Sequence, residues 1–204
     1  MGIGVLGPFE VVAGGAPLAV GGPQPRAVLA LLALRANEVV GAATLVDGLW
    51  GDRPPDTAVR VVRTYVSRLR RVLDGVPELG AHVVSASPGY RLAIDPEQVD
   101  ALLFERLVTS ARAHAEGSRL DAAAAELRRA VDVWRGDVLA DMPGLRPARA
   151  AVSHLEQLRL AALDERVEAD LRWVGTPGSS PSWWSSRGPT RTGSGCGASS
   201  WLPL

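Results

Sequence analysis

The chain has 204 residues, of which 47% are hydrophobic, and its 22 basic and 22 acidic residues give a formal net charge of zero. This length accommodates one large or two small domains with a folded core. The single cysteine, Cys196, excludes an intrachain disulfide and a cysteine metal cluster. The longest apolar run, residues 27–34, is too short to span a bilayer, and no signal peptide is visible. We therefore expect a cytoplasmic protein without membrane contact.

Charge is distributed unevenly along the chain. Residues 1–94 contain nine arginines and seven acidic residues, a net charge of +2. Residues 95–171 contain ten arginines and fifteen acidic residues, a net charge of −5, whereas residues 172–204 contain three arginines and no acidic residue. We interpret these ranges as two domains and a tail of different character. No lysine is present, which fits the codon bias of a GC-rich gene.

The first ninety residues alternate between strand and helix patterns. Short strands are predicted over residues 3–12 and 18–20, on either side of a Gly-Gly turn. Apolar residues at helical spacing then predict a helix over residues 25–40. A second, short helix is expected within residues 41–55, with Thr44 as its N-cap.

A third helix and a hairpin complete this half. The helix is expected to begin after Asp56 or Thr57 and to end near Leu73, and the hairpin over residues 82–94 turns at Ser87-Pro88-Gly89. Strands, three helices and a hairpin predict an α+β winged helix-turn-helix with a small leading antiparallel sheet. We expect a self-contained core for residues 1–94.

The third predicted helix divides into an apolar and a basic face. The apolar stripe comprises Val59, Val62, Val66, Leu69 and Leu73. The opposite face comprises Arg60, Thr64, Ser67 and Arg71, flanked by Arg63 and Arg70, with Arg68 off its centre. An ordinary solvated helix usually mixes charges of both signs, but no acidic residue lies on this face after Asp56. A short helix before it and a wing-like hairpin after it favour a recognition helix, because arginine binds guanine edges and phosphates.

The second half of the chain has a purely helical pattern. Helices are predicted over residues 98–117, 119–136 and 146–171. Antiparallel helical hairpins of this length indicate an all-α, TPR-like helical repeat of which only part is present. No cofactor, metal or enzyme motif appears: His82, His114 and His154 have no ligand-like spacing, and no phosphate loop or nucleophile elbow is found.

Two segments of the first half, RTYVSRLRR (63–71) and SPGYRL (87–92), resemble the winged DNA-binding domain of the OmpR/PhoB type. Residues 104–141 resemble the bacterial transcriptional activation domain that follows it in the Streptomyces antibiotic regulatory proteins. The resemblance extends from residue 1 to about residue 171. It implies an activator, often of secondary-metabolite clusters, that binds direct repeats near promoters and recruits RNA polymerase.

The resemblance also implies particular contact residues. For double-stranded DNA these are Arg60, Arg63, Thr64, Ser67 and Arg71, with Arg91 on the wing. For RNA polymerase they are Asp52, Arg53 and Asp56 in the loop before the third helix, where a plain turn is the alternative. Pairing of two copies on the repeat stays open. No receiver domain precedes the wing in this sequence, so we expect control by abundance, or by a ligand or partner of the helical domain.

A different class of function stays open, namely a protein-interaction adaptor, or a truncated regulator without function, whose helical domain binds a partner. The tail from residue 172 supports truncation, because it is rich in tryptophan and has no acidic residue or helical period. A disordered tail is one interpretation. We favour a frameshift, since one allowed reading in a shifted frame, with GC-rich codons chosen for the tail, is an amphipathic helical sequence similar to the family's continuation; the nucleotide sequence of the gene tests this. Loss of the later helices would expose Leu160 and Leu163.

Overall fold

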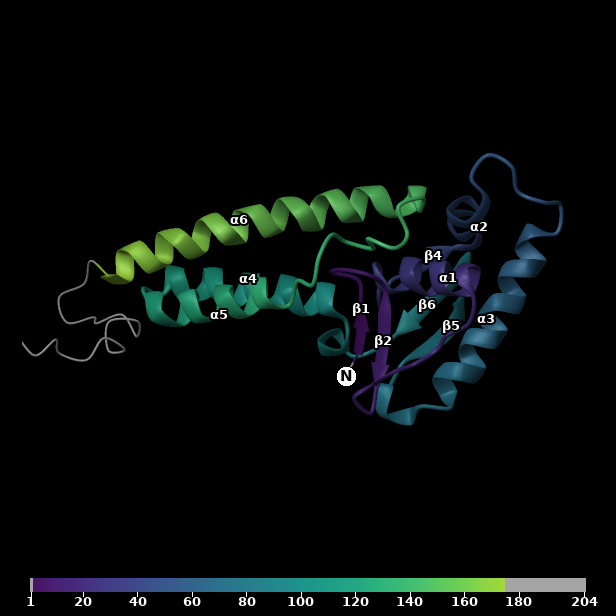
Figure 1. Cartoon of the computed structure of the whole chain (residues 1–204), viewed down its shortest axis with the longest axis horizontal. Helices are drawn as coiled ribbons and strands as arrows, with labels where there is room; N and C mark the ends of the chain where they lie inside the picture. The colour runs from purple at the N-terminus through teal and green to yellow at the C-terminus, as the bar shows by residue number, and fades with distance from the viewer. Residues whose placement is uncertain (1, 175–204) are drawn as a thin grey trace, which may run out of the picture.

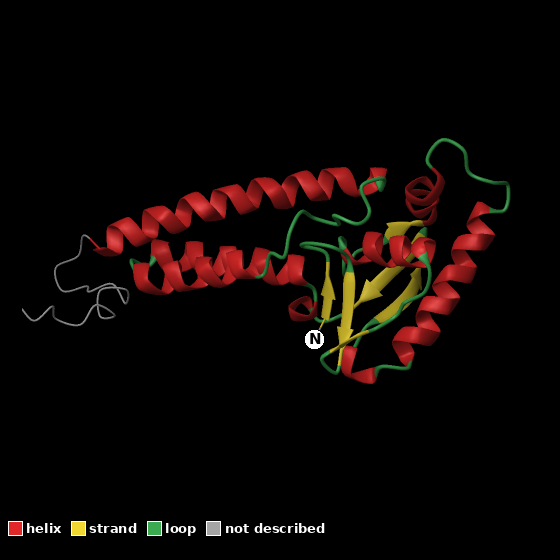
Figure 2. Cartoon of the chain, in the orientation of Figure 1, coloured by secondary structure: helices red, strands yellow, loops and turns green. Residues whose placement is uncertain are grey.

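The computed structural model describes residues 2–174, which form an elongated molecule with two ends of different construction (Figure 1). Two small sheets and three helices form one end, and three further helices extend away from it. Figure 2 shows that the strands are confined to the first end. The architecture confirms the predicted winged helix-turn-helix with a leading sheet, followed by a helical part.

The N-terminal sheet is antiparallel, with its strands in the order β1 (Gly2–Gly4), β2 (Glu10–Ala13) and β3 (Ala16–Pro17). Gly14 and Gly15 form the two-residue turn between β2 and β3 with φ angles of 60° and 82°, a region that favours glycine. The prediction of a strand over residues 18–20 is therefore wrong by two residues, because this tight turn starts the pairing at Ala16.

Helix α1 (Pro23–Ala33) ends seven residues before the predicted end at residue 40. Beyond it Asn37 has a φ of 68°, and its side-chain amide exchanges two hydrogen bonds with the backbone of Ile94. Val40 and Gly41 then form strand β4 (Val40–Gly41) instead of a helical turn. The predicted helix is too long because hydrogen bonds to the hairpin, far along the chain, replace those of a longer helix.

Helix α2 (Ala42–Trp50) follows β4 directly, so its N-cap is Gly41 and the predicted cap Thr44 lies inside the helix. Helix α3 (Ala58–Asp74) is amphipathic as expected, and its buried residues are Ala58, Val62, Val66, Leu69 and Leu73. Val59 is 47% exposed, so its assignment to the apolar stripe is wrong. Val59 lies at one edge of the predicted stripe and is not covered by other residues. Ala58, at the opposite edge, is buried instead.

The wing is the predicted hairpin of β5 (His82–Ala86) and β6 (Gly89–Ala93). Strand β4 pairs with β6, which gives a three-stranded sheet in the order β4-β6-β5. Gly89 permits this pairing, because a Cβ atom there would lie 2.0 Å from the carbonyl oxygen of Val40. The Ser87–Pro88 peptide bond in the turn is cis.

The helical end consists of the hairpin α4 (Asp100–Glu116) and α5 (Leu120–Asp132), with the long α6 (Arg149–Val174) lying along it (Figure 1). The rings of Phe104 and Trp134 pack edge to face in its core, with centroids 5.3 Å apart. The three predicted helices are present in order, although α5 ends four residues early. Within residues 2–174 no helix is long and apolar enough to cross a membrane.

A largely buried carboxylate, 13% exposed, joins the two ends of the molecule. Asp100, at the start of α4, accepts hydrogen bonds from the backbone N–H of Val5 (2.8 Å) and Leu6 (2.9 Å), and from Arg135 (3.2 Å). Burial raises the pKa of the Asp100 carboxyl above its ordinary value, while these three donors act in the opposite direction. The backbone N–H of Arg135 donates to the carbonyl of Leu6 (2.8 Å) instead of to a carbonyl of α5, which explains the early end of that helix.

A second carboxylate, Asp141, accepts a hydrogen bond from the Phe9 N–H (2.7 Å) and pairs with Arg26 (2.9 Å). The hydrophobic core also continues from one end to the other, with Leu6 and Phe9 in the same cluster as Trp134. The prediction of a self-contained core for residues 1–94 is therefore wrong. The suspected frameshift segment, residues 172–204, lies outside the described residues except where α6 continues to Val174.

Candidate nucleic-acid interface

The outward face of α3 forms an open concavity of about 460 Å³ on the molecular surface. Its lining consists of six exposed residues: Arg60, Arg63, Thr64, Ser67, Arg68 and Arg71. The Thr64 hydroxyl donates to the Arg60 carbonyl (3.1 Å), so its oxygen lone pairs remain available as acceptors. The fold thus gathers five of the six residues that the sequence predicts to contact DNA.

The four arginines of this concavity have no ion-pair partner among residues 2–174. Four cationic groups therefore lie on one helix face without counter-charges. Such an arrangement produces a positive potential that attracts a polyanion such as a nucleic acid backbone.

The positions of Arg68 and Arg70, at the two edges of this face, differ from those that the sequence predicts. The Nε atom of Arg70 donates to the Val83 carbonyl (2.6 Å), and its Nη2 atom donates to the Ser85 hydroxyl (2.8 Å). Arg70 therefore ties α3 to the wing, whereas Arg68 lines the concavity. The interpretation that Arg70 flanks the basic face and Arg68 lies away from it is reversed, because β5 offers acceptors on only one side of α3.

A second open concavity, of about 440 Å³, lies between α3 and the wing. Val59 and Arg63 line it from the helix, and residues 85–90 line it from the wing. Since Arg63 lines both concavities, they adjoin along α3. Arg91 lines neither: it lies opposite Val84 in the hairpin, so its exposed side chain is on the other face from Tyr90.

The loop between α2 and α3 contains the three residues predicted to contact polymerase. The carboxylate of Asp52 pairs with Arg146 (2.9 Å), which belongs to a 3₁₀ turn (Arg146–Ala148) before α6. The Asp52 carboxylate raises the pKa of the Arg146 guanidinium, and Asp47 adds to the effect. Arg53 and Asp56 are exposed. Sequence reasoning missed Arg146 because no motif links it to a loop so distant in the chain.

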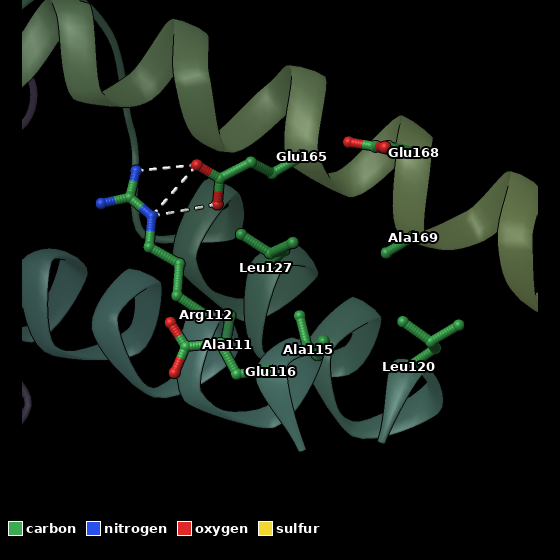
Figure 3. A pocket seen from close by; sticks show the side chains of 10 residues that line it. Ala111, Arg112, Ala115, Glu116, Leu120, Leu127, Glu165, Glu168 and Ala169 are labelled. Carbon is green, nitrogen blue, oxygen red and sulfur yellow. Dashed lines mark hydrogen bonds and ion pairs between the residues drawn. The ribbon is translucent and has the colours of Figure 1, made fainter. Parts of the chain in front are cut away.

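The helical end contains an apolar groove of about 310 Å³ between α4, α5 and α6 (Figure 3). Alanine and leucine side chains, including Ala115, Leu127 and Ala169, form most of its walls. Arg112 reaches from α4 to Glu165 on α6, with Nη2 and Oε1 2.7 Å apart, as Figure 3 shows. This ion pair joins two helices at the groove.

Two of the three histidines of the described part lie beside carboxylates. His82 lies 3.3 Å from Asp74, and His154 lies 3.5 Å from Glu105. Across residues 2–174, the His, Cys, Asp and Glu side chains do not gather into a group that could hold a metal ion.

Two protein-family models match the chain. Residues 20–92 match the model described as "Transcriptional regulatory protein, C terminal", and residues 99–175 match the "Bacterial transcriptional activator domain". Together they account for the winged helix and the helical end in the order that the sequence predicts. In domain order and in sequence the chain is similar to the Streptomyces antibiotic regulatory proteins. This family consists of transcriptional regulators with an OmpR/PhoB-type winged helix and an activator domain.

Individual members of the family are similar over most of this chain. Regulatory protein DnrI of Streptomyces peucetius is 37% identical over 84% of this chain and 65% of its own length. Regulatory protein AfsR of Streptomyces coelicolor is 41% identical over 82% of this chain and 16% of its own length. The chain therefore spans less than two thirds of these relatives.

A solved structure has the same fold. Mycobacterium tuberculosis EmbR, in complex with a low-affinity phosphopeptide, is 32% identical and superposes with a TM-score of 0.77. The match covers 83% of this chain and 45% of EmbR. This likeness includes both ends of the molecule, so the joined arrangement of winged helix and helical part is shared with a family member.

Proposed function

We propose that this chain is a sequence-specific DNA-binding regulator that activates a secondary-metabolite gene cluster by binding direct repeats near promoters and recruiting RNA polymerase. The observation that carries the proposal is the exposed face of α3, with four arginines that lack ion-pair partners among the described residues. The matches to two domain models of transcriptional regulators support it.

The chemistry of the α3 face suits the major groove of B-DNA, which admits an α-helix. Arg60 and Arg71, at the centre of the face, are proposed to bind guanine edges, which arginine contacts through two parallel hydrogen bonds. Arg63, Thr64 and Ser67 are proposed to bind bases or phosphates, since guanidinium and hydroxyl groups can hydrogen-bond to either. Arg91, on the outer face of the wing, is proposed to contact a phosphate or the minor groove.

The surface proposed to contact RNA polymerase is the loop with Asp52, Arg53 and Asp56. The ion pair between Asp52 and Arg146 attaches this loop to the helical end, so a partner of the loop also meets residues near the start of α6. In this scheme residues 1–94 bind DNA and residues 95–171 help to recruit the polymerase.

The experiment that tests DNA binding is selection from a random DNA pool, followed by gel-shift titration of the enriched sequence. Affinity should fall steeply with salt, because phosphate contacts release counterions. Arg60→Ala or Arg71→Ala should each weaken binding by about 1–3 kcal/mol if the residue binds a base. Arg129→Ala is the matched control, since Arg129 is an exposed arginine paired with Glu126 in α5. Unchanged binding of both α3 variants would reject the proposed face.

A second candidate function is a protein-interaction adaptor, and two observations on the helical end favour it. One is the apolar groove of Figure 3, and the other is the apolar stripe on α6 formed by Leu160, Val167 and Leu171, which are 63%, 53% and 69% exposed. Leu163 is only partly exposed, unlike the expectation for a truncated chain. Failure to enrich any DNA from the random pool at low salt would favour the adaptor.

A further inference from the structure

The surface of α3 and the wing that is proposed to bind DNA contains one exposed apolar side chain. The packing of the protein does not account for this apolar residue. Val59 is the second residue of α3 and is 47% exposed, whereas the other apolar residues of the expected stripe are buried. A β-branched residue also forms helices less readily than alanine or arginine. Neither burial nor helix propensity therefore accounts for valine at this position.

The surroundings of Val59 fit a methyl group. It lines the concavity between α3 and the wing, together with three apolar residues of the chain: Ala42, Ala86 and Pro88. Arg63, one helical turn later, lines the same concavity. A methyl group that enters this concavity can therefore contact apolar side chains, with the Arg63 side chain on the same wall.

We infer that Val59 contacts the C5 methyl group of a thymine when DNA occupies this surface, and that it selects thymine at one position of the binding site. This inference rests on the proposed DNA-binding function. Thymine is the only standard base with a methyl group in the major groove, and apolar side chains recognise it there. Residues near the N-terminus of a recognition helix are the ones that contact base edges in helix-turn-helix proteins.

The geometry also relates this position to that of Arg63. Four helical residues advance about 6 Å along the axis, and successive bases on one strand are about 3.4 Å apart. The thymine selected by Val59 should therefore lie one or two base pairs from the base or phosphate that Arg63 contacts. Arg63→Ala should alter the site next to the thymine and leave the thymine preference itself intact.

The test compares full-length wild type, Val59→Ala and Val84→Ala by selection from the same random pool. Val84 is the control because it is also a partly exposed valine, at 38%, but lines neither concavity. Alanine favours helix, so Val59→Ala should fold, which a thermal melt verifies. Wild type and Val84→Ala should enrich thymine at one position, and Val59→Ala should lose that preference while keeping the rest of the sequence.

A second test measures the contribution of the thymine methyl group alone. Deoxyuridine in place of the selected thymine should weaken wild-type binding about fourfold, as expected for one buried methyl group, and leave Val59→Ala binding unchanged. If Val59→Ala keeps the thymine preference, or if deoxyuridine does not affect the wild type, the inference is overturned and DNA binding stands. If the wild type enriches no sequence, the proposed function fails and the inference fails with it.

Discussion

The arginines at the two ends of the molecule differ in their partners, and this difference separates arginines that hold the fold from those proposed to bind DNA. At the helical end, six arginines pair with carboxylates: Arg106, Arg112, Arg128, Arg129, Arg135 and Arg146. On α3, the four arginines of the open concavity have no such partner within residues 2–174. Arg119, Arg149 and Arg166 of the helical end also form no ion pair within the described residues, so what distinguishes α3 is that four unpaired arginines gather on one helix face.

The absence of ion-pair partners on α3 lowers the folding stability little, and it favours the binding of a polyanion. An exposed ion pair contributes only about 0–1 kcal/mol to stability, so α3 loses little by having none. The same four charges without partners remain available to a polyanion, whose contacts they can strengthen many-fold at low salt. Variants at each end can therefore break or sharpen the comparison.

The largest effect is expected at the joint between the two ends. Asp100→Ala removes the acceptor for the N–H groups of Val5 and Leu6 and leaves Arg135 with one carboxylate fewer. Buried donors without acceptors are costly, so the free energy of unfolding should fall by about 3 kcal/mol in denaturant titration. Glu156→Ala, at an exposed position of α6, should change it little. Equal stability of the two variants would mean that the joint does not hold the ends together.

The next largest effect is expected at Arg70, the arginine of α3 that acts structurally. Arg70→Ala removes two hydrogen bonds to β5, and the free energy of unfolding should fall by about 1.5 kcal/mol. DNA protection under the wing should weaken in footprinting, whereas protection under α3 should persist. Loss of DNA binding without loss of stability would instead mean that Arg70 contacts DNA directly. The distinction between the structural arginine and the four arginines of the concavity would then fail.

A smaller effect is expected at Arg68, which the fold assigns to the concavity. Arg68→Ala should weaken DNA binding by about 1 kcal/mol and lower the slope of log affinity against log salt by about one unit, if it contacts a phosphate. Its stability should match that of the wild type. The sequence interpretation, in which Arg68 lies away from DNA, predicts the same affinity and salt slope for both proteins.

The smallest effect is the pH dependence at the joint. Burial raises the pKa of Asp100, so its contribution to stability is greatest below the ordinary aspartate pKa of about 3.9 and is lost as the pH rises through the raised pKa. The stability of the wild type relative to Asp100→Asn should therefore decline between pH 3 and pH 7, as measured by denaturant titration. A relative stability that rises with pH would mean that the donors from Val5, Leu6 and Arg135 outweigh burial.

Local signals account for the elements that the sequence predicted well. The period of α3, the wing turn at Ser87-Pro88-Gly89 and the three later helices each depend on residues close together in the chain. The early ends of α1 and α5 have one cause in common, namely partners far away in the sequence, whereas the shifted strand β3 results from the local turn at Gly14 and Gly15. Asn37 bonds to Ile94, which ends α1 early, and Arg135 bonds to Leu6, which ends α5 early.

The candidate site shows the same division. Helical periodicity placed Arg60, Thr64, Ser67 and Arg71 on one face without any structure. It placed Arg68 and Arg70 at opposite edges of that face, about 70° and about 90° from its centre at 100° per residue, and did not show which edge the wing covers. Only the wing, packed against one side of α3, engages Arg70 and leaves Arg68 and Val59 exposed.

The sequence by itself determined that this chain has a winged helix with a basic face on its third helix and a helical part, because these depend on local periodicity and on turn residues. Tertiary structure alone decided which arginines are paired, which valine is exposed and how the two ends are joined. Those properties depend on where Asp100, Asp141 and the wing meet segments distant in the chain, and a one-dimensional pattern does not contain that distance information.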